Sequence, residues 1–157
     1  MISPQKSKGF QRLLELSQTQ LEQMAQRLRT LHQNHQTALQ QLQQLKQYHQ
    51  EYTHRLNTTS KLGVSIANYH NFMRFISTLE TAMTEQNNRV AQLSTQRAEA
   101  QQKWQELRQR CKAFETLIQR AQQAAQYEAN RHVQRHNDEI ASQLAQRAQA
   151  PFSQEIL

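Results

Sequence analysis

The chain has 157 residues, of which 36% are hydrophobic, and it carries 19 basic against 12 acidic side chains for a formal net charge of +7. This length suits one ordinary domain, but the apolar fraction is too small for a thick globular core. Only two glycines and two prolines occur, so the chain lacks the turns that a β-sheet needs. The composition therefore argues against a sheet and favours long helices.

The first predicted helix spans about residues 5–57. From Phe10 to Leu56 its apolar residues are spaced alternately by four and by three, which is the heptad spacing of a coiled coil. With Leu14 at heptad position a, only Ser17, His35 and His49 interrupt the apolar a and d positions. The abundant Gln leaves an aggregation-prone disordered segment as an alternative, but Gln is a good helix former and the sustained period favours a helix.

A turn is predicted at about residues 58–66, because turn-forming residues gather there around Gly63. The second predicted helix covers about residues 67–149, and its heptads run from Tyr69 to Ala125. A short tail covers residues 150–157. A short loop between two amphipathic helices makes them antiparallel neighbours. We therefore expect an all-α fold, a single antiparallel coiled-coil hairpin in which the second helix is longer than the first.

Two registers place a positions opposite d positions across this hairpin. One pairs Leu56 with Phe72, and the other, shifted by one heptad, places Trp104 opposite Ser17. The Leu56–Phe72 register is favoured because it sets large side chains against suitable partners and allows a less strained loop. The polar core positions His35, His49, Gln86 and Arg97 are interpreted as register-setting or snorkelling exceptions.

In the favoured register the second helix has no partner beyond Ile118. An isolated helix is marginally stable in water. We therefore predict that this overhang binds another protein, and this is the first indication of function in the sequence.

No sequence motif for nucleotide binding, metalloprotease or nucleophilic chemistry occurs, so we expect neither an enzyme nor a cofactor. Cys111 is alone and is expected to be a buried reduced thiol. His132 and His136 have metal-ligand spacing but no further ligands nearby, so solvated histidines are favoured over a metal site. The first residues contain no apolar leader segment, so we expect a cytoplasmic protein.

The hairpin head carries the most specific sequence signal. Tyr48–Asn57, YHQEYTHRLN, and Asn68–Met83, NYHNFMRFISTLETAM, resemble the flagellar type III export protein FliJ family, in which a Tyr-x-x-x-Tyr ends the first helix and a Phe-Ile-x-x-Leu-Glu-x-Ala opens the second. The later segments QQKWQELRQRCKAFETLIQR and EANRHVQRHNDEIASQLAQR extend the similarity to about Leu14–Arg147.

This resemblance implies a stalk-like connector of the flagellar export apparatus, at the cytoplasmic face of the inner membrane. Its implied partners are the export ATPase and its regulator, the export gate protein FlhA and export chaperones, and it would be peripheral to the membrane through these proteins. The alternatives are the equivalent stalk of a virulence injectisome, or a generic basic coiled coil that binds nucleic acid. The basic residues are scattered among acidic ones, so specific nucleic-acid binding is disfavoured.

The resemblance also implies two binding regions. The gate-binding patch maps onto Gln41, Leu45, Tyr48, Tyr52, Phe75, Leu79, Ala82 and Gln86. Gln86 departs from the His that the family can have there. Several of these residues lie at heptad position g, beside the core, so an interface and a widened seam are both open interpretations. The contact with the ATPase ring is expected at Arg120, Ala121, Ala125, Arg131, Val133, Arg135 and Ile140.

Overall fold

The computed structural model describes residues 4–150, and it has two long helices that pack against each other. α1 covers Pro4–Lys61, 58 residues, and α2 covers Ile66–Gln149, 84 residues. No strand occurs within the described range. The expected all-α fold with a longer second helix is confirmed. The expected tail lies, apart from Ala150, outside the described residues.

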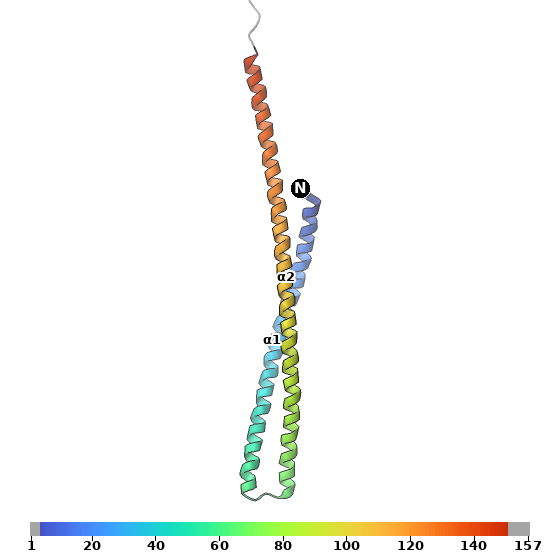
Figure 1. Cartoon of the computed structure of the whole chain (residues 1–157), viewed down its shortest axis with the longest axis vertical. Coiled ribbons are helices and arrows are strands. Elements are labelled where there is room, and N and C mark those ends of the chain that lie inside the picture. The colour runs from blue at the N-terminus through green and yellow to red at the C-terminus, as the bar shows by residue number, and fades with distance from the viewer. Residues whose placement is uncertain (1–3, 151–157) are drawn as a thin grey trace, which may run out of the picture. The chain divides into compact units, whose positions relative to one another are not determined.

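The described residues divide into two compact units. The head unit is Gln18–Arg108, which contains the turn, and the end unit combines the start of α1 through Ser17 with α2 from Gln109 onward. In the head unit the chain runs down α1, turns, and returns along α2 as an antiparallel hairpin (Figure 1).

The first helix ends about one turn later than the sequence predicts. Thr58 and Thr59 donate their hydroxyl hydrogens to the carbonyl oxygens of His54 and Arg55, at 2.9 and 2.6 Å. Ser60 does the same to Asn57 at 3.1 Å. These bonds satisfy the hydroxyl groups inside the helix, so residues typical of turns continue α1 through Lys61.

The connection between the helices is made by Leu62, Gly63, Val64 and Ser65. Gly63 has a φ of 82°, the left-handed conformation that usually ends a helix and that favours glycine. Ser65 caps α2: its Oγ accepts a hydrogen bond from the backbone N–H of Asn68 at 3.4 Å, and its carbonyl accepts one from Tyr69 at 3.1 Å. The turn is therefore fixed locally by one glycine and one cap.

The core of the head unit is one side chain thick. Leu31, Ala38, Leu93 and Ala100 form a buried cluster, and Met24, Leu28 and Val90 pack against it. All of these residues occupy a or d positions of the predicted heptads. Each large apolar side chain removed from water contributes about 1.5–3 kcal/mol, so these layers stabilise the hairpin.

Polar side chains in the core make bonds across the two helices. The amide Nε2 of Gln86 donates to the carbonyl oxygen of Ala38 at 2.9 Å and to Oε1 of Gln41 at 3.1 Å. His49 Nε2 lies 3.1 Å from Glu80 Oε1. These pairings agree with the Leu56–Phe72 register, since the register shifted by one heptad would place Gln86 opposite His35. The polar positions thus help to specify the alignment of the helices.

In the end unit the first turns of α1 cover only part of α2. Ser17, Cys111, Ile118 and Ala121 are buried there. Beyond Glu128, every residue of α2 up to Gln149 is exposed, and the orange-to-red end of α2 continues alone past the start of α1 (Figure 1). The overhang therefore begins later than Ile118, since Ala121 is still buried.

We expect the overhang to contribute almost nothing to the stability of the packed part. A chain that ends after Asn130 removes only exposed residues of the described structure, so its thermal melting temperature should stay within about 2 °C of the full chain. Circular dichroism checks this result. As the matched control, deletion of residues 1–17 uncovers Ile118 and Ala121 and should lower the melting temperature. An equal decrease in melting temperature in the two variants would show that the overhang packs on the coiled coil.

Cys111 is a free, buried thiol, as the sequence predicts. Burial raises its pKa, and the nearby carboxylate of Glu115 raises it further. The thiolate is the reactive form. Alkylation of the folded protein by iodoacetamide near pH 8 should therefore be at least about tenfold slower than in denaturant, and mass spectrometry of the quenched samples measures both rates. Equal rates would contradict the burial of this thiol.

Candidate functional site

The eight residues that the resemblance implies as a gate-binding patch all lie in the head unit. We call them the aromatic strip: Gln41, Leu45, Tyr48 and Tyr52 of α1, and Phe75, Leu79, Ala82 and Gln86 of α2. Since g positions of antiparallel helices face each other along one edge of a coiled coil, the heptad frame places Gln41 and Tyr48 on the same edge as Phe75 and Ala82. Contacts between the two helices bear this out at both ends of the strip.

At the end nearer the turn, the strip is a cluster of aromatic rings. The ring centroids of Tyr52 and Phe75 are 4.4 Å apart with planes tilted by 54°, and Tyr52 also lies 6.4 Å from Phe72. The guanidinium of Arg55 sits 5.5 Å from the centre of the Tyr52 ring, within the range of a cation–π interaction. Asn68 and Asn71 border a shallow hollow of about 210 Å³ beside these rings. The aromatic side chains are therefore held in place before any partner binds.

At the end farther from the turn, the strip consists of the hydrogen-bonded side-chain amides of Gln86 and Gln41. Gln86 uses both hydrogens of its amide within the hairpin, on Ala38 and on Gln41. Its amide hydrogens are therefore not free to bond to a partner protein. The position where this chain departs from the family pattern thus has a structural role of its own.

The members of the strip differ in how much surface they present. Leu79 is 7% exposed and belongs to the core, whereas Tyr48 is 52% and Phe75 41% exposed. Leu45, Tyr52, Ala82 and Gln86 are half-buried. Large aromatic side chains left this open are typical of interfaces when they lie together. The chemistry available here is the burial of apolar surface, with a tyrosine hydroxyl for orientation.

The second expected set lies in the end unit. Arg120, Ala125, Arg131, Val133, Arg135 and Ile140 are exposed, Val133 by 60% and Ile140 by 44%. Ala121 is only 6% exposed, because the start of α1 covers it. Tyr127, 66% exposed, adds an aromatic ring that the sequence reasoning did not single out, since it lies outside both heptad tracks.

Sequence reasoning missed a further feature of the head unit, a hollow on the other edge of the coil around Arg97. The sequence signal for this hollow was Arg97 itself, because a charged residue is unusual at heptad position a. Among the described residues no three side chains are arranged to hold a metal ion, and no helix has a stretch apolar enough to cross a bilayer.

The fold and the strip together define a two-helix coiled-coil protein with exposed aromatic side chains along one edge. A family model described as "Flagellar FliJ protein" matches residues 6–150. The chain belongs to this FliJ family of flagellar proteins.

Two curated relatives carry the same description, one from Escherichia coli (strain K12) and one from Salmonella typhi. Each is 34% identical over 97 residues, which is 62% of this chain and 66% of the relative's own length. No solved structure matches the chain.

Proposed function

We propose that the protein is a connector of the flagellar type III export apparatus, which links the export ATPase ring to the export gate protein FlhA and assists in the handling of chaperones and substrates. The observation that carries this proposal is the Tyr52–Phe75 pair beside the exposed Tyr48 ring. The core layers do not require aromatic rings at this edge, so we infer that these rings bind a partner.

A connector needs two separate binding surfaces, and the chain has a candidate in each unit. The aromatic strip belongs to the head unit, and the exposed stretch of α2 beyond Glu128 belongs to the end unit. The two surfaces differ in chemistry. The strip is apolar and aromatic, whereas the overhang mixes Arg131 and Arg135 with Asp138 and Glu139 around Val133 and Ile140. This difference supports two different partners, FlhA at the strip and the ATPase ring at the overhang.

A pull-down from a flagellated bacterium tests the proposal. The full chain should bring down both the export gate protein and the export ATPase. The chain that ends after Asn130 should lose the ATPase but keep the gate protein, because its head unit is unchanged. A Tyr48→Glu chain should lose the gate protein alone. Loss of both partners in either variant, with the fold intact by circular dichroism, would contradict the assignment of one partner to each unit.

The proposed place of the protein in the cell follows from its partners. It is peripheral at the cytoplasmic face of the inner membrane, held there by FlhA and the ATPase. Fractionation should therefore find it with membranes in the wild-type cell, and the share found with membranes should fall when the aromatic strip carries Tyr48→Glu.

A further inference from the structure

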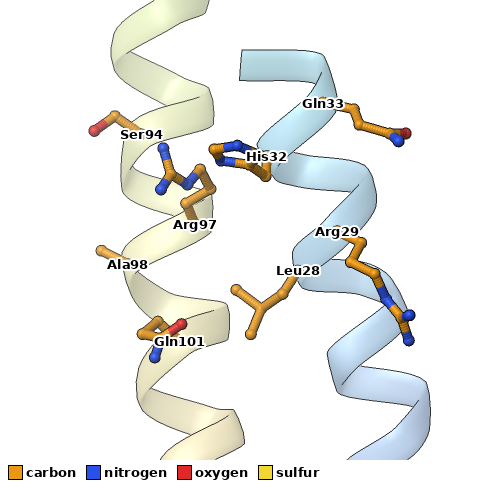
Figure 2. Close-up of a pocket in the computed structure, with 8 residues that line it drawn as sticks. All are labelled: Leu28, Arg29, His32, Gln33, Ser94, Arg97, Ala98 and Gln101. Carbon is orange, nitrogen blue, oxygen red and sulfur yellow. The ribbon is translucent and has the colours of Figure 1, made fainter. Parts of the chain in front are cut away.

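The edge of the head unit opposite the aromatic strip carries a hollow of about 680 Å³ between α1 and α2 (Figure 2). Here the e positions of the two helices meet, whereas the strip lies at the g positions. The hollow is lined by Leu28, Arg29, His32, Gln33, Ser94, Arg97, Ala98 and Gln101. None of these eight residues is acidic, while two are arginines and one is a histidine.

Arg97 is the central group of this hollow. It occupies a heptad a position and is half-buried, directly beside the apolar cluster that contains Leu93 and Ala100. Its Nη1 lies 3.3 Å from Nδ1 of His35. A guanidinium is always charged and can only donate. An imidazole carries no negative charge, so the contact with His35 does not compensate the charge of the half-buried guanidinium.

No side chain that lines the hollow carries a negative charge to offset that of Arg97. His32 points from α1 toward Arg97, while Arg29 and Gln33 point away from α2 (Figure 2). Arg29 forms an ion pair with Glu22 at 3.2 Å, but both side chains are more than 60% exposed, and such a surface pair contributes little. Glu22 does not line the hollow, so its carboxylate does not neutralise Arg97.

We propose that this hollow receives an acidic side chain, Asp or Glu, of a helical segment of a partner protein. A guanidinium binds a carboxylate through two parallel hydrogen bonds, and the remaining donors of Arg97 suit this geometry. Leu28 and Ala98 supply apolar contacts beside the charge, which fit the neighbouring apolar side chains of an amphipathic helix. The charge complementarity, together with these apolar walls, favours a peptide over a free inorganic anion. This surface is separate from those assigned above.

The test uses the full chain and a synthetic amphipathic helical peptide that contains only Glu, Ala and Leu, with a second peptide in which Gln replaces every Glu. Binding is followed by ¹⁵N NMR at physiological salt. The Glu peptide should shift the amide signals of Gln33, Ala98 and Gln101, and the Gln peptide should bind at least about tenfold more weakly.

Two variants locate the binding. Ser94→Glu places a carboxylate of the chain itself at the hollow and should weaken binding of the Glu peptide at least about tenfold. Ser77→Glu makes the same change at another exposed position of α2 and should bind nearly as the wild type does. Both positions are exposed, so the fold is preserved. Arg97→Gln should lose binding as Ser94→Glu does, whereas Arg74→Gln, with the same change in net charge, should retain it.

Several results would overturn the proposal. Equal weakening by Ser94→Glu and Ser77→Glu would show that only the net charge matters. Shifts confined to residues outside the hollow, or no binding of the Glu peptide, would exclude this site. Inorganic phosphate that shifts the same signals with the same affinity would identify a small-anion site and exclude the peptide.

Discussion

Replacing Leu31 with Asp should lower the free energy of unfolding by about 3–5 kcal/mol. Leu31 is 8% exposed and belongs to the buried cluster with Ala38, Leu93 and Ala100. The substitution removes the apolar contacts and places a carboxylate in a core one side chain thick. Arg97 stands opposite position 31 in the Leu56–Phe72 register, and its charge offsets only part of this cost. Helicity at 37 °C should fall sharply, and urea unfolding followed by circular dichroism measures the change.

The matched control is Leu16→Asp, the same change at a side chain that is 57% exposed on α1. Surface substitutions of this kind usually alter stability by less than about 0.5 kcal/mol. If both variants lost the same stability, the assignment of the heptad core would be wrong, since the cost would then come from helix propensity and not from burial.

Charge in the aromatic strip should abolish binding to the export gate while the fold remains intact. Tyr48 is 52% exposed, so Tyr48→Glu removes an exposed ring without opening the core. Phe75→Glu removes a ring that packs on Tyr52 at 4.4 Å. If the strip is the gate-binding surface, each change should raise the Kd for FlhA at least about thirtyfold, because aromatic residues at the centre of an interface contribute about 2 kcal/mol or more.

Calorimetric titration with the purified cytoplasmic part of FlhA measures this effect, and swimming in soft agar reports its consequence in the cell. Tyr127→Glu is the control, since this ring is 66% exposed but lies in the end unit. It should leave the Kd and the melting temperature unchanged. Wild-type affinity in both strip variants would mean that the rings only widen the seam between the helices.

The heptad spacing of the sequence by itself determined the two helices, their antiparallel pairing and most of the core. Leu31, Ala38, Leu93 and Ala100 fall at a and d positions in the sequence and are buried in the structure. This works because a two-helix core depends on local periodicity: each residue faces inward or outward according to its place in the heptad. Gly63 likewise marked the turn, since one residue had to adopt a positive φ.

The end of α1 was not predictable in the same way. Thr58, Thr59 and Ser60 have the composition of a turn, yet their hydroxyl groups bond to carbonyl oxygens of the preceding turn and the helix continues. Their intrinsic preference for turns is weak compared with the continuity of the helix, so composition alone placed the boundary several residues too early.

Only the tertiary structure decided the register and the surfaces. The sequence allowed two alignments because a shift of one heptad preserves every match of a with d, and the bonds of Gln86 and His49 across the helices distinguish them. The hollow around Arg97 and the burial of Ala121 also depend on which residues stand opposite each other. Heptad periodicity specifies which face of a helix is buried, whereas the alignment of two helices depends on pair contacts that no single periodic pattern contains.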